Sequence, residues 1–520
     1  MQTRTRRTFL EDIGRGMLVA GVGYGVASDL GFASAFGADA PERIDFGSME
    51  PLVRLMQETP VNKLVPTLMD RVRAGTSLKD LVAAGALANA RTFGGEDYTG
   101  FHTIMALAPA YHMSQEMPEG RQPLPVLKVL YRNTSRIHET GGVANEVLHP
   151  VRPAELSGGQ DAGDAVREAV RTKNVDVAEG TFAALAKGSP EDLFNSLLHA
   201  VHDNTEVHRV VLPFRAFVLL DLVGAQHAHT MLRQSLRYCV RAEKGSRNTE
   251  WDRPRTLLPK LLEEHKLLGR KPGNRKADDA WVDQMSQTLF KVSADEAAAA
   301  AAAALAEGFE PDAIGEAISL AANQLVLRDV GRSAREEYTG KPIGSVHGDS
   351  IGVHASDSAN AWRNMARFSN PRNAFACLIL GAYQVALDRV NRGGDFQNWQ
   401  PHPIATHLDR VKTTDPKALL AEAEEAIRGN LQGRAAAIIH RYGELGHPHR
   451  GAFDLMLRYA TSEDGALHAE KYYRTASEEF ATTRPAFRWR QLVALARVTA
   501  SECGRPAPGY DEACELLKVS

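Results

Sequence analysis

The chain has 520 residues, of which 43% are hydrophobic and 24% charged, and its formal net charge is −3. These values are typical of a globular protein, and they exclude a global basic field that would recruit nucleic acid or an acidic membrane. The four cysteines are too few for a disulfide scaffold, and none has the CxxC spacing of zinc ribbons. Cys503 and Cys514 lie close enough to pair, and the sequence leaves their state open.

The first 38 residues have the layout of an export signal. Arg4, Arg6 and Arg7 form a basic start, a weakly apolar stretch covers residues 17–27, and small residues follow at 33–35. The apolar stretch is too short to span a membrane, so the pattern is typical of a secretory signal.

The Arg6-Arg7 pair, with a Phe-Leu pair two residues later, resembles the twin-arginine signal of bacterial export. Glu11 and Asp29 depart from the best version of that pattern. The resemblance implies a protein that meets the twin-arginine translocase, crosses the membrane folded, and works in the periplasm or outside the cell. Cargo of this pathway often receives its cofactor before export, so the resemblance also favours a bound metal, haem or organic cofactor.

The rest of the chain is predicted to be all-α. Apolar residues recur at helical spacing along its length, whereas the alternation typical of strands is nearly absent. The clearest helical segments are 78–91, 190–202, 215–237, 313–328, 374–390 and 416–442. Ser293 to Glu296 form a capping-box pattern ahead of an alanine run, which has high helix propensity. No later stretch has eighteen uninterrupted apolar residues, so we expect no membrane span.

A short internal echo suggests a duplication. Residues 96–100 read Glu-Asp-Tyr-Thr-Gly, and residues 336–340 read Glu-Glu-Tyr-Thr-Gly. A helical segment precedes each copy and two histidines follow each. Arg215 and Arg372 extend the echo, because each stands nine residues before a Gly-Ala pair in an apolar helix. We therefore expect two related helical halves, residues 45–290 and 291–520, with a site between them.

The densest group of candidate metal ligands is His199, His202 and Glu206. On a helix these residues are three and four positions apart, so their side chains share one face within reach of a single ion. His208 would lie on the opposite face of an unbroken helix, and it joins the group only if the helix ends near Asp203.

The echo contributes a second set of ligands. His102 and His112 follow its first copy, and His347 and His354 follow its second. Imidazole is a common protein ligand for zinc, copper and iron. The sequence therefore predicts that His102, His354 and their partners converge with the His199 group on one centre. His468, by contrast, is interpreted as part of a surface helix.

Other residues receive supporting roles. Tyr98 or Tyr338 would supply a proton or a hydrogen bond, and Asp349 would act as a general base, as would Glu206. Arg215 and Arg372 would hold an anionic cofactor or small-molecule substrate. The sequence contains no GxSxG, GxxxxGK[ST], HExxH or CxxCH motif, so serine-hydrolase, phosphate-loop, zincin and covalent-haem chemistries have no support.

Three functions fit these features. The first is a metal-dependent oxidoreductase with iron or copper, because histidine-rich sites with few carboxylates favour those metals over magnesium or calcium. The second is a metal-dependent hydrolase, in which zinc or iron would activate a water molecule. The third is an exported protein that binds metal or haem without catalysis. Non-covalent haem needs only one or two histidine ligands and stays an alternative cofactor.

Overall fold

The computed structural model describes residues 43–156, 159–245, 250–337, 339–391 and 393–519. The predicted signal segment and Tyr338 lie outside these residues. Within them the chain folds into helices joined by turns, with two isolated β-bridges and no strand. The predicted all-α class is confirmed. In the same part of the chain, no helix is long and apolar enough to cross a membrane.

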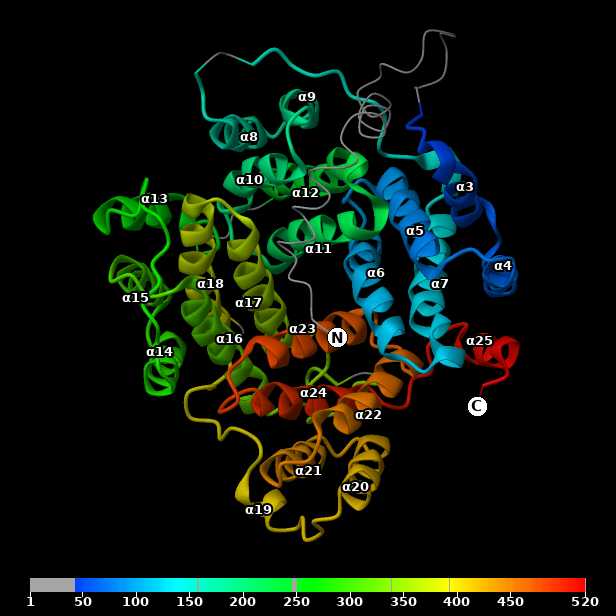
Figure 1. The fold of residues 1–520 in the computed structure, drawn as a ribbon, viewed down its shortest axis with the longest axis vertical. Coiled ribbons are helices and arrows are strands. Elements are labelled where there is room, and N and C mark those ends of the chain that lie inside the picture. The colour runs from blue at the N-terminus through cyan, green and yellow to red at the C-terminus, as the bar shows by residue number, and fades with distance from the viewer. Residues whose placement is uncertain (1–42, 157–158, 246–249, 338, 392, 520) are drawn as a thin grey trace.

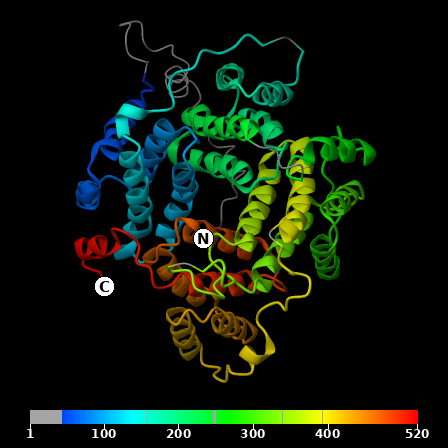
Figure 2. The same cartoon turned by 180° about the vertical axis from the view of Figure 1, so that it is seen from behind.

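The N-terminal residues form a first bundle, blue and cyan in Figure 1. Its helices are α3 (Glu50–Glu58), α4 (Val61–Arg73), α5 (Leu78–Phe93), α6 (Tyr98–Glu116) and α7 (Pro123–Glu139). The helix at the other end of the chain, α25 (Tyr510–Leu517), packs against α4 and α7. The first and last parts of the chain therefore meet in one bundle, as both Figure 1 and Figure 2 show.

A second bundle lies across the molecule from the first (Figure 1). It contains α14 (Asp279–Lys291), α15 (Ala294–Ala306), α16 (Pro311–Arg328), α17 (Ile351–Phe368) and α18 (Pro371–Asn391). Here α13 (Pro254–Glu264) packs against α15 and α18. The predicted capping box is present at α15, where the Ser293 and Glu296 side chains each accept a hydrogen bond from the other residue's backbone N–H.

Two further helical groups lie above and below these bundles in Figure 1. The upper group is α8 (Ala162–Arg171), α9 (Val175–Leu185), α10 (Pro190–Val201), α11 (Val207–Val223) and α12 (Ala228–Lys244). The lower group is α19 (Ala405–Leu408), α20 (Pro416–Arg428), α21 (Gln432–Glu444), α22 (His449–Ser462), α23 (His468–Thr482) and α24 (Trp489–Glu502). Single 3-10 turns at Gly47–Met49, Glu119–Arg121, Gly142–Asn145 and Ala225–His227 complete the helical elements.

The centre of the molecule is where the four groups meet. Both α11 and α23 pack against α6 of the first bundle and against α17 of the second. One continuous apolar core runs from Ile44 through Leu387, and a second core lies mainly within the lower helices. The larger core crosses the expected boundary at residues 290 and 291, so the two expected halves share their interior.

The copies of the sequence echo occupy different structural positions. Residues 96–100 lead directly into α6, whereas the described residues of 336–340 form a turn in the loop between α16 and α17. Arg215 and Arg372 also occupy different structural positions relative to the Gly-Ala pairs that follow them. The helix that contains Arg215 ends at Val223, one residue before Gly224, whereas the helix that begins beside Arg372 continues through Gly381.

Candidate functional site

Four histidines from four helices meet at the centre of the molecule. They are His102 of α6, His208 of α11, His354 of α17 and His468 of α23. Their imidazole centroids form a closed circuit with separations of 4.8 Å, 6.2 Å, 5.5 Å and 5.2 Å, taken in the order 102, 208, 354, 468 and back to 102. We call this set the four-histidine cluster.

Within the cluster the imidazoles approach each other in pairs. The Nε2 atoms of His102 and His208 are 3.3 Å apart, and those of His354 and His468 are 3.5 Å apart. Two imidazole nitrogens bound to one tetrahedral metal at 2.0–2.1 Å lie about 3.4 Å from each other. Each pair therefore has the spacing of two ligands on one ion.

A break between two helices brings His208 into the cluster. The helix α10 ends at Val201, and α11 begins at Val207 with the Glu206 carboxylate capping its first turn. The turn between them is fixed by Arg171, which donates two hydrogen bonds of 2.7 Å and 2.8 Å to the Asp203 carboxylate. Because the helix direction changes here, His208 points away from His199 and towards α6.

Hydrogen bonds at the opposite nitrogens orient the first pair. His102 Nδ1 lies 2.7 Å from the carbonyl oxygen of Tyr98, and His208 Nδ1 lies 2.6 Å from Glu206 Oε1. Since both partners accept, both Nδ1 atoms carry the proton and donate it. In the neutral form of each ring the Nε2 atom then presents a lone pair, which is the form that binds a metal.

The local charges keep the cluster in this form. Burial, reinforced by the Lys471 charge, holds the pKa of His102 and of His468 well below the usual histidine range. Burial also lowers the pKa of Lys471 itself to about 8, although Asp357 opposes the shift. Burial disfavours the Glu206 carboxylate, yet the His208 charge and hydrogen bond lower its pKa to about 2. The cluster thus places the neutral imidazoles of His102 and His468 near an ionised carboxylate that supports His208.

Aromatic side chains surround the first pair on its solvent side. Tyr98 is 62% exposed, and its ring centroid lies 4.4 Å from that of His102 and 5.9 Å from that of His208. Tyr238 donates a hydrogen bond of 2.8 Å to Glu206 Oε2 and packs edge-on against Phe101. The His208 side chain keeps 13% exposure. The cluster therefore lies just beneath the surface near Tyr98.

Of the seven predicted metal ligands, the cluster includes only His102 and His354. His112 lies on the same helix as His102 but ten residues later, about 15 Å along the axis. The Glu206 carboxylate accepts a hydrogen bond from the Nδ1 atom of His208. His347 lies in the loop before α17, where it lines a cleft with Asp349 and Trp399.

The remaining predicted ligands belong to a separate group near α8. His199 Nδ1 lies 3.0 Å from Asp164 Oδ1, and His202 packs against Trp362 with its Nε2 3.6 Å from the Cys377 sulfur. The residues His199, Asp161 and Asp164 form a group that could hold a metal ion. Among the described residues it is the only group of three or more His, Cys, Asp or Glu whose ligand atoms all lie within 4.8 Å of one another, and no three histidines of the four-histidine cluster meet that spacing.

The supporting residues predicted from the sequence have mixed positions. Asp349 accepts hydrogen bonds from Arg332 at 2.6 Å and Lys341 at 2.7 Å, and these cations lower its pKa to about 2 despite its burial. Such a carboxylate is a poor general base. Arg215 is buried and donates to Thr475 Oγ1 at 3.3 Å, within the region of Lys471 and Asp357.

Arg372 contributes its charge to the group near α8. That charge, together with burial, lowers the pKa of both His199 and His202. Asp164 is also bonded to Arg167 at 2.9 Å. A metal ion bound at His199 would therefore compete with Arg167 for the Asp164 carboxylate and face the Arg372 charge.

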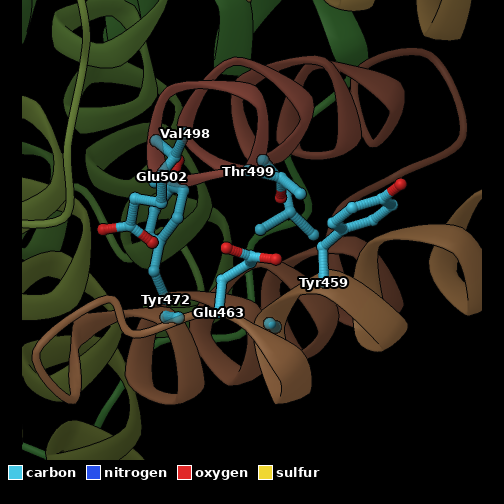
Figure 3. Close-up of a pocket in the computed structure, with 9 residues that line it drawn as sticks. Tyr459, Glu463, Tyr472, Val498, Thr499 and Glu502 are labelled. Carbon is cyan, nitrogen blue, oxygen red and sulfur yellow. The ribbon is translucent and has the colours of Figure 1, made fainter. Parts of the chain in front are cut away.

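A small cavity lies between α22, α23 and α24 (Figure 3). Its volume is about 10 Å³, which is room for a single water molecule. Glu502 lines it and accepts a hydrogen bond of 2.8 Å from the backbone of Gly348. Burial raises the pKa of Glu502 to about 7. The cavity is too small to admit a substrate.

Comparisons with protein families, with curated proteins and with solved structures return no match to this chain. The site's chemistry therefore has to be argued from the residues themselves. All four cysteines are free thiols, and the spacing that would let Cys503 and Cys514 pair does not produce a disulfide.

Proposed function

We propose that this protein is an exported metalloprotein with one iron or copper ion at the four-histidine cluster, and that it catalyses an oxidation or reduction of a small molecule. The observation that carries the proposal is the pairing of His102 and His208. Their Nε2 atoms lie 3.3 Å apart while both Nδ1 protons are already donated elsewhere. With both rings neutral, a cation between the two nitrogens would accept both lone pairs as ligand bonds.

The donor set favours iron or copper over zinc. Four imidazoles complete the tetrahedral coordination of zinc, which leaves no position for a reacting molecule. Iron and copper accept further ligands beside four imidazoles, so a substrate or dioxygen can still bind. When bound, such a metal would supply the electron-transfer step. The short distances lie within each pair, and no three of the four histidines have ligand nitrogens all within 4.8 Å of one another, so binding of one ion would draw the two pairs together.

The surroundings favour an oxidoreductase over the alternatives. A hydrolase needs a general base, and the two carboxylates expected for that role, Glu206 and Asp349, both have a pKa of about 2 and accept hydrogen bonds from neighbouring side chains. A haem needs a flat slot beside its histidine, whereas His102 and His208 are already in contact with each other's rings. Lys471, buried beside the cluster with a pKa of about 8, can hold and release a proton near neutral pH.

We also propose that the two parts of the chain arose by duplication, with an equivalence different from the sequence echo. The helices α5, α6 and α7 pack together as do α16, α17 and α18. The helix that ends the first part, α13, packs on the second bundle, and the helix that ends the second part, α25, packs on the first. Gly100-Phe101-His102 then matches Gly352-Val353-His354, and residues 265–278 form the boundary.

This equivalence pairs the four histidines by symmetry. His102 corresponds to His354 and His208 to His468, because α11 and α23 occupy matching places against α6 and α17. Each part supplies one pair with a short Nε2 separation. A metal at the centre would lie where the two parts meet. Export rests on the N-terminal signal pattern alone, with the twin-arginine translocase as partner.

The decisive experiment is elemental analysis and optical spectroscopy of the protein purified through its own export pathway. We expect one equivalent of iron or copper and no Soret band. His102→Gln should lose the metal, whereas His112→Gln, on the same helix, should keep it. A wild-type protein without stoichiometric metal, or a His102→Gln variant with full metal content, would overturn the proposal.

A further inference from the structure

A second cleft, separate from the four-histidine cluster, lies between the second bundle and the lower helices. It has a volume of about 370 Å³ and is formed by α14, α16, α19, α21, α24 and the loop at 401–403. None of these helices contributes to the four-histidine cluster. Clefts of this size hold small organic molecules.

One wall of the cleft carries a positive charge without a carboxylate partner. Arg328 is half-buried, and among the described residues its hydrogen bonds go to neutral acceptors: the Gln324 side chain at 3.0 Å and the Trp399 and Gln397 carbonyl oxygens at 2.7 Å and 3.5 Å. Burial lowers its pKa. A guanidinium in this setting gains the most from an anion that enters the cleft.

The other ionisable groups that line the cleft do not neutralise the charge of Arg328. Asp283 lines the cleft but pairs with Arg490 at 3.2 Å, and His440 pairs with Glu444 at 3.2 Å. Behind His402, Arg497 is buried against backbone carbonyl oxygens and the Gln432 side chain, and burial lowers its pKa to about 10. The local field is therefore positive.

His402 provides a second contact for a ligand. Burial, with the charges of Arg497 and His407, lowers the pKa of His402 to about 3, so its imidazole is neutral. Its Nδ1 atom is closed to solvent and has no hydrogen-bond partner among the described residues. A ligand in the cleft therefore meets the rest of this neutral ring, which lines the cleft.

The rest of the lining is apolar. Leu327, Pro401, Pro403, Leu408 and Val493 supply this surface. A ligand that satisfies Arg328 therefore has an anionic end, and its other end buries hydrocarbon.

We propose that this cleft is a binding site for a small organic carboxylate with an apolar body, held by Arg328 and His402. The carboxylate accepts hydrogen bonds from the guanidinium, and the neutral His402 imidazole packs against the ligand. The site is independent of the metal centre, because it uses different helices.

The test is isothermal titration of the full-length protein with three probes: phenylacetate, its neutral analogue phenylacetamide, and inorganic phosphate. We expect phenylacetate to bind at one site, with phenylacetamide and phosphate each weaker by at least about tenfold, since both anionic and apolar contacts are needed. These comparisons use the wild-type chain and do not depend on the folding of any variant.

Two arginine variants then locate the site. Arg328→Gln should weaken phenylacetate binding by at least about tenfold. Arg389→Gln is the matched control, because Arg389 also has a burial-lowered pKa and donates to backbone carbonyl oxygens but lies outside the cleft. It should leave binding within about twofold of the wild type. The proposal is overturned if phenylacetate does not bind, if phosphate binds as tightly, or if Arg328→Gln binds like the wild type.

Discussion

The Nε2 atoms of His102 and His208 lie 3.3 Å apart although the residues are 106 positions apart in the sequence. Each imidazole is fixed by its Nδ1 atom, one on the Tyr98 carbonyl and the other on the Glu206 carboxylate. These two hydrogen bonds orient the rings so that their Nε2 atoms point towards each other. Such second partners of metal-binding histidines set both the tautomer and the ring orientation.

The first prediction concerns the carboxylate behind His208. In Glu206→Gln the amide can still cap α11 through its oxygen, but it no longer offers two anionic acceptors to His208 and Tyr238. We expect the metal dissociation constant to rise by about 10- to 100-fold, measured by competition with a chelator. Tyr238→Phe removes only one hydrogen bond to the same carboxylate, so its effect should be a few-fold. Equal affinity in Glu206→Gln and the wild type would show that the carboxylate does not support a ligand.

The second prediction distinguishes a single metal ion shared by both histidine pairs from one ion in each pair. If both histidine pairs share a single ion, His354→Gln should remove the whole equivalent of metal even though His102 and His208 remain intact. If instead each pair held its own ion, the variant would keep half the metal of the wild type. Elemental analysis of the two proteins decides between these results, and we expect complete loss.

The sequence predicted the fold class well because helical periodicity is local. Apolar spacing and the capping box at α15 depend on neighbouring residues, and the structure confirms both. The site depends on longer-range geometry. The sequence left the position of His208 open, because it depends on whether the helix ends near Asp203; the poor helix formers Asp203 and Asn204 were the only signal for the break that the structure shows at residues 202–206.

The buried position of His468 also depends on contacts between distant parts of the chain. Its sequence neighbours Glu470, Lys471 and Tyr473 are polar, which favoured a surface helix, yet all three are buried beside α6 and α17. Burial of such residues requires partners from distant parts of the chain: Glu470 pairs with Lys128 at 2.7 Å, and Tyr473 donates to Glu116 at 2.7 Å. These long-range pairs cannot be inferred from a single sequence.

The third prediction tests the close packing that positions His354. A Cβ atom on Gly352 would lie 2.6 Å from the backbone nitrogen of Val326 and 2.8 Å from the carbonyl carbon of Leu325. Gly352→Ala must therefore push α17 away from α16. We expect a loss of stability of roughly 1–3 kcal/mol in urea unfolding, with weaker metal binding.

The control for this variant is Gly120→Ala, where the nearest atom to an added Cβ lies 3.7 Å away on Val519. That substitution should change the free energy of unfolding by less than about 0.5 kcal/mol. If Gly352→Ala were as stable as Gly120→Ala and bound metal normally, the contact between α16 and α17 would not be needed to place His354.

The fourth prediction concerns the buried carboxylate beside the small cavity. Burial raises the pKa of Glu502 to about 7, above its value of 4.5 in the unfolded chain, although the Gly348 N–H and Lys128 oppose the shift. A carboxyl group whose pKa is raised by folding favours the native state below the unfolded pKa. Its contribution is lost as the pH rises towards the folded pKa. Wild-type stability from this group should therefore fall between about pH 4.5 and pH 7.

Glu502→Gln removes that pH dependence while its side-chain oxygen can still accept from Gly348. We expect the variant to be more stable than the wild type by about 3 kcal/mol at about pH 8, and the difference to vanish near pH 4, as followed by chemical unfolding. Glu463→Gln is the matched control at the same cavity. Because the Glu463 carboxylate accepts hydrogen bonds from Gly504 and Arg505, its loss should destabilise the protein. A Glu502→Gln variant less stable than the wild type at pH 8 would mean that the ionised carboxylate is stabilised by its neighbours, chiefly the buried Lys128, more than burial destabilises it.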